Sequence, residues 1–190
     1  MKALSRWFYC FGQKTKGMRK IILTYGLIAG VIVSIMILGS IPLWNRGILN
    51  FDNSEIVGYT TIVIALSMVF FGIKSCRDYH FGGSISFWQG VKIGLMITLI
   101  GSVMYALAWE ISQTLMPEFS DKMWEHFADK AKSESRDEAE LKAAMQQVEN
   151  WKELYKNPLM RFGIALVEIA PIGILITLIS AAILRKNNEL

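Results

Sequence analysis

Four long apolar runs constrain the fold of this chain more than any other feature of its sequence. They extend over Ile21–Ile41, Ile56–Ile73, Gly90–Ile111 and Phe162–Leu184. An α-helix needs about 20 apolar residues to cross the roughly 30 Å hydrocarbon core of a bilayer. Each run reaches or approaches that length, so the sequence predicts an all-α integral membrane protein with four transmembrane helices.

The positions of the basic residues indicate how these helices are oriented in a membrane. The loop after the first run holds a single basic residue, Arg46, whereas basic residues gather before the first run, after the second and after the fourth. They are Lys2, Arg6, Lys14, Lys16, Arg19, Lys20, Lys74, Arg77, Arg185 and Lys186. Because short cytoplasmic loops carry an excess of lysine and arginine, both termini are expected in the cytoplasm.

The apolar runs divide the chain into five segments. Residues 1–20 form a basic cytoplasmic segment, residues 21–116 contain the first three spans, and residues 161–185 form the fourth span. Residues 186–190 form a cytoplasmic tail. Residues 117–160 are expected outside the cytoplasm, because long loops cross a membrane largely regardless of their charge.

The external segment is expected to form an amphipathic helical hairpin. Apolar residues recur at helical spacing in two stripes: Phe119, Met123 and Phe127, then Leu141, Met145, Val148, Trp151 and Tyr155. Ser135–Glu138 has the form of a capping box, which predicts that the second helix begins with Ser135 as its cap. The two helices could pack on each other, lie on the outer leaflet, or hold a membrane or periplasmic protein partner.

Small residues predict how the spans pack. Helices in lipid associate through small residues that allow close approach of their backbones. The predicted packing residues are Gly26, Gly30 and Ser34; Gly58, Ala65 and Gly72; Gly90, Gly94, Thr98, Gly101, Tyr105 and Ala108; and Gly163, Ala170, Gly173, Thr177 and Ala181. Together they favour a compact bundle.

A carboxylate inside the fourth run is the main candidate for a polar intramembrane site. Glu168 lies three residues before Pro171, which leaves the carbonyl of Val167 without its helical partner. A neutral carboxyl group can donate a hydrogen bond, and this carbonyl is the expected acceptor. Arg161 and Glu110 are the other candidate partners of Glu168.

Three interpretations of Glu168 remain open. A carboxylate in hydrocarbon is costly, so its face should meet the bundle interior, a cavity or a second protomer. The residue could be a buried polar clasp that fixes the register of the bundle. It could also handle a proton or an ion, or contact a partner.

No catalytic, cofactor-binding or metal-binding motif is recognisable. His80 and His126 are expected on opposite sides of the membrane, and no Cys/His spacing fits zinc. The glycines of Phe81–Ser84 are expected to form a turn. Glu110 with Glu168 as an acid/base pair remains an alternative, but the favoured expectation is a chain that is not an enzyme and binds neither cofactor nor metal. A formal charge of +4 without a recognition motif does not indicate nucleic-acid binding.

Four stretches resemble a family of small bacterial membrane proteins catalogued as domain of unknown function 4199. They begin at Arg19, Glu55, Gly82 and Tyr155 and read RKIILTYGLIAGVIVSIM, EIVGYTTIVIALSMVFFGIKSCRD, GGSISFWQGVKIGLMITLIGSVMYALAW and YKNPLMRFGIALVEIAPIGILITLISAAILRK. The resemblance covers residues 18–186 and implies a four-helix protein of the bacterial inner membrane with no assigned activity. The first 17 residues depart from the family pattern, as a basic cytoplasmic arm or as an upstream start that the cell does not use.

These observations predict a non-enzymatic structural, assembly or regulatory membrane module that presents residues 117–160 to a partner. A homo-oligomer is a further expected assembly. The alternative is a small transporter or channel that uses Glu168. A wholly buried Glu168 with fixed partners would favour the first function, and a water-lined path reaching it from outside would favour the second.

Overall fold

The computed structural model describes residues 2–186, with side chains described from residue 16 onward except those of residues 52 and 55. The predicted tail 186–190 therefore lies outside the described residues apart from Lys186, as do the side chains of Lys2, Arg6 and Lys14. The described residues form six α-helices. They are α1 Lys2–Asn45, α2 Phe51–His80, α3 Phe87–Leu115, α4 Pro117–Glu134, α5 Glu138–Tyr155 and α6 Pro158–Leu184.

Four of these helices are long and apolar enough to cross a membrane. The candidate spans are Lys16–Asn45, Ile56–His80, Phe87–Leu115 and Pro158–Leu184, within α1, α2, α3 and α6. Helices α4 and α5 form a hairpin between the third and fourth spans. The predicted all-α fold, with four candidate spans and this hairpin, is confirmed.

Helices α2 and α3 begin before the apolar runs because polar caps fix their first turns. At the start of α2, Asn50 and Asn53 each accept a hydrogen bond at 2.9 Å from the backbone N–H of the other. Ser86 and Gln89 form the same reciprocal pair at the start of α3. Such capping boxes satisfy N–H groups that have no partner within the helix.

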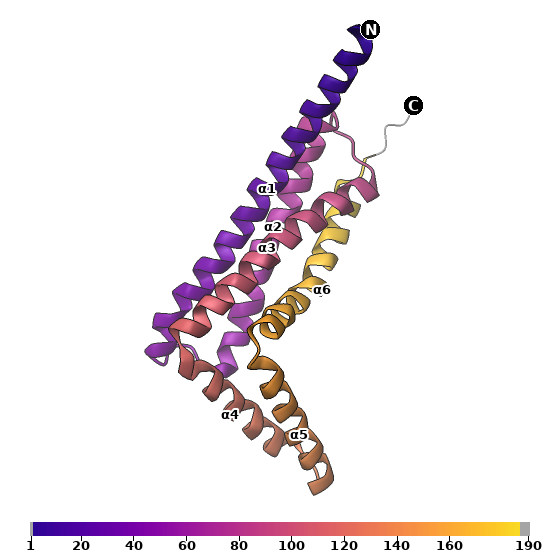
Figure 1. The fold of residues 1–190 in the computed structure, drawn as a ribbon. Coiled ribbons are helices and arrows are strands. Elements are labelled where there is room, and N and C mark those ends of the chain that lie inside the picture. The colour runs from indigo at the N-terminus through magenta and orange to yellow at the C-terminus, as the bar shows by residue number, and fades with distance from the viewer. Residues whose placement is uncertain (1, 187–190) are drawn as a thin grey trace.

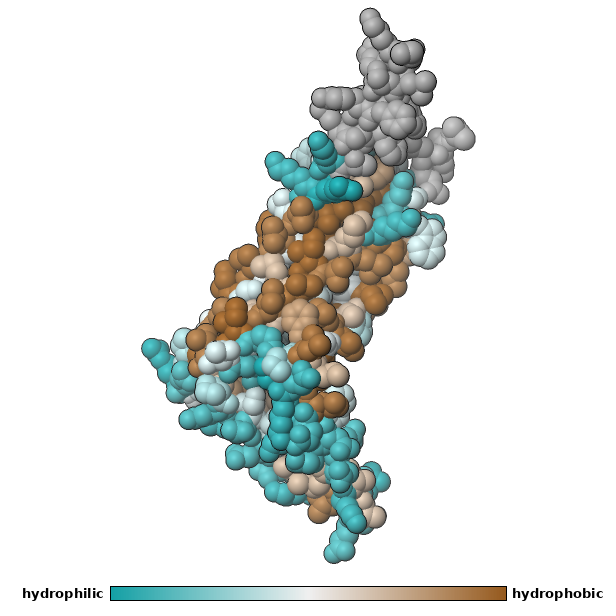
Figure 2. All heavy atoms as spheres, viewed as in Figure 1, coloured by the Kyte–Doolittle hydropathy of each residue, from teal (hydrophilic) through white to brown (hydrophobic). Residues whose placement is uncertain are grey.

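Helix α3 lies at the centre of the bundle. It packs against α1, α2 and α6, and α2 also packs against α1 and α6. The start of α1 and the end of α6 lie at one end of the bundle, and the α4–α5 hairpin projects from the other (Figure 1). Hydrophobic residues form a belt along the bundle, while hydrophilic residues cover the hairpin and gather at the opposite end (Figure 2). This distribution fits helices surrounded by hydrocarbon along their middle length.

Small residues bring α3 and α6 together, as predicted. A Cβ atom added to Gly94 would lie 2.6 Å from Cγ2 of Thr177, and one added to Gly90 would lie 3.0 Å from Cβ of Ala181. The hydroxyl groups of Thr98 and Thr177 are 3.3 Å apart across the same contact. A side chain larger than hydrogen at either glycine would therefore push the two helices apart.

Two glycines of the predicted packing faces do not make such contacts. A Cβ atom on Gly58 of α2 or Gly163 of α6 would meet nothing within 4 Å. The prediction that they pack against a neighbouring helix is wrong. Gly58 borders a cavity instead of a helix.

The start of α5 differs from the prediction. Its N-cap is Asp137, whose side chain accepts a hydrogen bond of 2.7 Å from the N–H of Glu140. Ser135 ends α4 instead, with its hydroxyl donating to the carbonyl of Ala131 at 2.6 Å. The charged carboxylate is the stronger acceptor for an N-cap, and the serine hydroxyl is already engaged by the preceding helix.

The loop between α2 and α3 contains the predicted turn. Gly82 and Gly83 have φ values of 63° and 85°, a region that glycine enters without a Cβ clash. After the turn, the carbonyl of buried Ile85 accepts a hydrogen bond of 3.1 Å from the N–H of Lys186. The loop is thereby joined to the end of α6.

Candidate functional site

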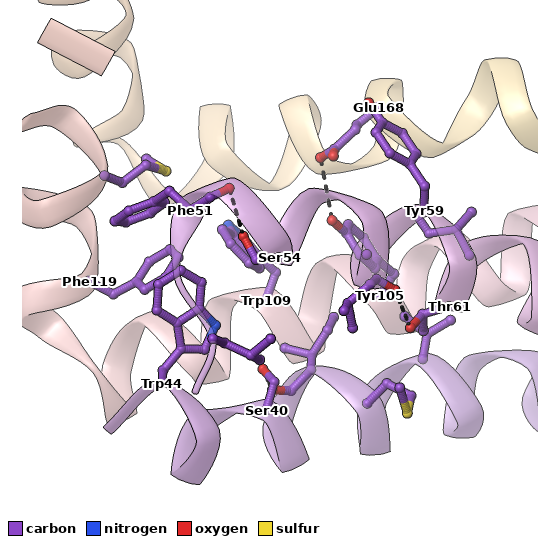
Figure 3. A pocket seen from close by; sticks show the side chains of 18 of the residues that line it. Ser40, Trp44, Phe51, Ser54, Tyr59, Thr61, Tyr105, Trp109, Phe119 and Glu168 are labelled. Atoms are coloured by element: carbon purple, nitrogen blue, oxygen red, sulfur yellow. Dashed lines mark hydrogen bonds between the residues drawn. The ribbon is translucent and has the colours of Figure 1, made fainter. Parts of the chain in front are cut away.

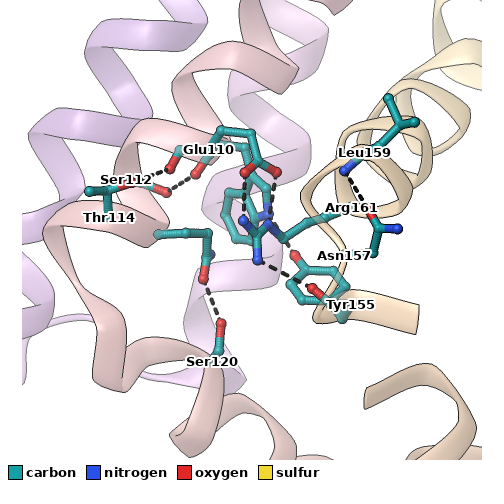
Figure 4. Close-up of polar contacts among 10 residues, drawn as sticks. Glu110, Ser112, Thr114, Ser120, Tyr155, Asn157, Leu159 and Arg161 are labelled. Carbon is teal, nitrogen blue, oxygen red and sulfur yellow. Dashed lines mark hydrogen bonds and ion pairs between the residues drawn. The ribbon is translucent and has the colours of Figure 1, made fainter. Parts of the chain in front are cut away.

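An ion pair joins α3 to α6 where the hairpin returns to the bundle. Arg161 donates from Nε to Oε1 of Glu110 at 2.8 Å and from Nη2 to Oε2 at 2.6 Å (Figure 4). Its Nη1 donates to the carbonyl of Tyr155 at 3.2 Å. The side chains of Arg161 and Glu110 are only 17% and 22% exposed. Two parallel hydrogen bonds between a guanidinium and a carboxylate fix both orientation and distance.

Tyr155, the last residue of α5, completes this contact. Its hydroxyl oxygen accepts a hydrogen bond of 2.6 Å from Nε1 of Trp109, and the guanidinium of Arg161 lies 5.7 Å from the centre of its ring. Burial raises the pKa of Tyr155 to about 12. We call Trp109, Glu110, Tyr155 and Arg161 the hairpin root, because they connect α3, α5 and α6.

An aromatic cluster holds the other arm of the hairpin. It consists of Trp44 of α1, Phe51 of α2, and Phe119 and His126 of α4. The ring centres of Trp44 and Phe119 are 5.0 Å apart, and those of Phe51 and His126 are 4.9 Å apart with nearly parallel planes. The hairpin is thus attached to the bundle at both of its ends.

A cavity of about 410 Å³ lies between α1, α2, α3, α4 and α6, and the aromatic cluster forms part of its wall. Tyr59, Tyr105 and Glu168 border one part of it, and Trp44, Phe51 and Phe119 border another (Figure 3). The hydroxyl of Tyr105 donates to Oε2 of Glu168 at 3.4 Å. Glu168 is exposed, so this bond does not enclose its carboxylate.

The structure separates the predicted intramembrane site into two parts. Glu110 and Arg161 bind each other, whereas the hydrogen bond of Glu168 goes to Tyr105 on α3. No ion pair joins Glu168 to Arg161 among the described residues, since seven residues separate them by about 10 Å along the helix axis.

The expected hydrogen bond from Glu168 to the carbonyl of Val167 is not formed in the described part of the chain, where the carboxylate turns across to α3. Pro171 lies on an exposed face of α6, which continues through it from Pro158 to Leu184. Of the surroundings considered for Glu168, the structure places it at a cavity wall.

The sequence patterns do not predict the polar contacts of three residues, Tyr105, Trp109 and Tyr155. The sequence places Tyr105 on a packing stripe and Tyr155 on an apolar hairpin stripe, and neither pattern indicates a polar contact. The available signal was chemical, because a buried tyrosine hydroxyl or tryptophan N–H usually finds a hydrogen-bond partner. Periodicity alone could not say which partner.

The four candidate spans indicate the class of this chain, that of multi-pass membrane proteins. A family model described as Protein of unknown function (DUF4199) matches residues 24–186, so the chain belongs to that family. The resemblance predicted from the span and loop motifs is confirmed. No curated protein and no solved structure matches the chain.

Proposed function

We propose that this DUF4199 protein is a non-enzymatic membrane module that presents its α4–α5 hairpin to a protein partner on the outer side of a bacterial inner membrane. The hairpin root carries this proposal. A bidentate ion pair and a tryptophan–tyrosine hydrogen bond hold the hairpin where α5 meets α6. These contacts fix the hairpin relative to the bundle, as the presentation of a surface to a partner requires.

The surface of the hairpin supports a docking role. None of the residues of α4 and α5 is fully buried, and Phe127, Trp151 and Leu154 are more than two-fifths exposed. Aromatic side chains are enriched at protein interfaces, where they supply much contact area for little lost freedom. A fixed hairpin with exposed aromatic residues suits recognition of a second protein.

The orientation follows from charge. Seven basic residues lie at the end of the bundle opposite the hairpin, on helix ends or in the adjoining loop. They are Lys16, Arg19, Lys20, Lys74, Arg77, Arg185 and Lys186. By the positive-inside rule that end is cytoplasmic. The hairpin then lies outside, where a membrane or periplasmic protein can reach it.

A second candidate function is transport or conduction that uses Glu168. It is favoured by one observation: Glu168 is an exposed residue of α6 and borders a cavity. A structural clasp would be expected to enclose its carboxylate more fully, so the ion-handling interpretation stays open beside the first proposal.

One reagent tests both the orientation and the partner. Gln147→Cys places a thiol on exposed α5, one turn from Trp151, and Tyr79→Cys places one at the opposite end, where the native side chain is 82% exposed. Both variants are made without Cys10 and Cys76. An impermeant photoreactive maleimide added to intact spheroplasts should label only the Gln147→Cys protein. Illumination should then produce one discrete protein adduct.

Each outcome has a defined meaning. Labelling of the Tyr79→Cys protein alone would reverse the orientation. Labelling of the Gln147→Cys protein without a discrete adduct would contradict the docking role, because a partner bound at Trp151 lies within reach of that thiol.

A further inference from the structure

The cavity beside Glu168 has features that the presentation of a hairpin does not require. Its volume of about 410 Å³ lies within the range typical of small-molecule sites, about 300 to 1,000 Å³. Five helices contribute to its walls, and most of the lining surface is apolar. A mostly apolar cavity with a small number of polar groups in its wall is the usual form of a ligand site.

Among the described residues, Glu168 has one side-chain partner inside the spans, Tyr105 of α3. Its hydrogen bond from Tyr105, at 3.4 Å, is long compared with the usual 2.7–2.8 Å between oxygens. No basic side chain of the described chain lies within 4.0 Å of its carboxylate, because Arg161 is committed to Glu110. A carboxylate in such a place gains most from a positively charged partner.

The surroundings of Glu168 suit a cation with an apolar body. Tyr59 and Tyr105 border the cavity beside the carboxylate (Figure 3), and the faces of tyrosine rings attract cations within about 6 Å. The titratable groups at the hairpin side of the cavity are His126 and Lys130 of α4. The positive charge of Lys130 disfavours a cation there and so favours one orientation, with the ligand's charge at Glu168.

The cavity is open beside α4, where Phe127 and Lys130 of its wall are exposed, and also at the side of the bundle. Its exposed wall residues include Gly58, Tyr59 and Glu168, which belong to α2 and α6. All three lie within the candidate spans Ile56–His80 and Pro158–Leu184. A ligand that enters between these helices comes from the apolar belt, so it must be amphipathic.

We propose that this cavity binds an amphipathic amine, with its ammonium group against the carboxylate of Glu168 and its apolar body among the walls toward Trp44 and Phe51. The proposal rests on the second candidate function only in giving Glu168 a functional role. The experiment below measures ligand binding and does not depend on transport, so a failure of binding and a failure of transport are distinguishable.

Three probes with one carbon skeleton test the charge preference. They are 4-phenylbutylamine, 4-phenylbutan-1-ol and 4-phenylbutyric acid. Each is titrated by calorimetry into the full chain in nanodiscs, with empty nanodiscs as the blank. A hydrogen bond to a charged group is stronger than a neutral one, so the amine should bind about tenfold more tightly than the alcohol. The acid should bind most weakly.

Two variants locate the site. Glu168→Gln should abolish the preference for the amine over the alcohol while retaining alcohol binding. The matched control Glu149→Gln, at an exposed position of α5, should keep the wild-type preference. Gly58→Leu adds a side chain to the cavity wall, at a position where a Cβ atom meets nothing within 4 Å, and should weaken binding of both amine and alcohol.

Equal affinity of the wild type for amine and alcohol would overturn the proposal. A Glu168→Gln protein that still prefers the amine would do the same. If Glu168→Gln does not fold, Gly58→Leu decides, because it replaces glycine with a better helix former. Unchanged amine binding in that folded variant would exclude this cavity as the site.

Discussion

The two halves of the helical bundle are packed in different ways, although both contain glycines at helical spacing. In the half near the termini, Gly90 and Gly94 bring α3 against α6. In the half near the hairpin, Gly58 and Gly163 meet no neighbouring side chain. Glycines at helical spacing therefore do not by themselves produce close packing.

The difference comes from the facing helix. Gly94 faces Thr177 and Gly90 faces Ala181, so a small residue meets a small residue and the backbones approach. Near the hairpin, the large rings of Trp44, Phe51 and Phe119 stand between the helices. Rings pack edge to face with gaps that small side chains do not leave, and a cavity forms beside them.

The largest expected effect comes from enlarging a glycine in the closely packed half. Gly94→Leu should destabilise the bundle by about 3 kcal/mol, because overpacking forces neighbouring groups apart. The measurement is thermal unfolding in detergent, followed by helical circular dichroism. The matched variant Gly163→Leu should change stability by no more than about 0.5 kcal/mol, because a Cβ atom there meets nothing within 4 Å. Equal losses in both variants would contradict the difference between the two halves.

Breaking the hairpin root should cost less. Arg161→Met removes the partner of Glu110 and should destabilise the protein by about 2 kcal/mol, below the usual cost of breaking a fully buried pair because both side chains are partly exposed. Lys156→Met, which breaks an exposed pair with Glu153, should leave the stability nearly unchanged.

A double variant sharpens this prediction. Adding Glu110→Gln to Arg161→Met removes the uncompensated carboxylate and should restore part of the lost stability. Thermal unfolding of the single and double variants measures the coupling between the two residues. Strictly additive losses would mean that the ion pair contributes nothing to the attachment of the hairpin.

The smallest effect should appear at high pH. Burial raises the pKa of Tyr155 to about 12, above its ordinary value near 10. The folded state therefore keeps a proton that the unfolded chain loses, so the stability from this group is complete below pH 10 and is lost as pH rises toward 12. The expected loss is about 1 kcal/mol, less than the pKa difference implies because the side chain is partly exposed.

Tyr155→Phe isolates this contribution, since lysines titrate equally in both proteins. Between pH 9 and pH 11.5, the melting temperature of the wild type should fall further than that of the variant. Parallel curves would show that the Tyr155 hydroxyl is not buried at the hairpin root.

The local features of this protein were determined by its sequence. The length of the apolar runs fixes the four candidate spans, because a helix must satisfy its own backbone hydrogen bonds in hydrocarbon. The stripe from Gly90 to Ala108 identifies the face of α3 that packs, and the adjacent glycines 82 and 83 identify a turn. Each of these depends on residues close together in the chain.

Only the tertiary structure decided which polar groups meet. Glu110 and Arg161 are 51 residues apart and Tyr105 and Glu168 are 63 apart. Glu168 had several chemically suitable partners. The rise of about 1.5 Å per residue separates it from Arg161 along α6. The contact of α3 with α6 brings Tyr105 within hydrogen-bonding distance instead. The cavity likewise depends on how five helices meet, because its volume is the space that their side chains together leave unfilled.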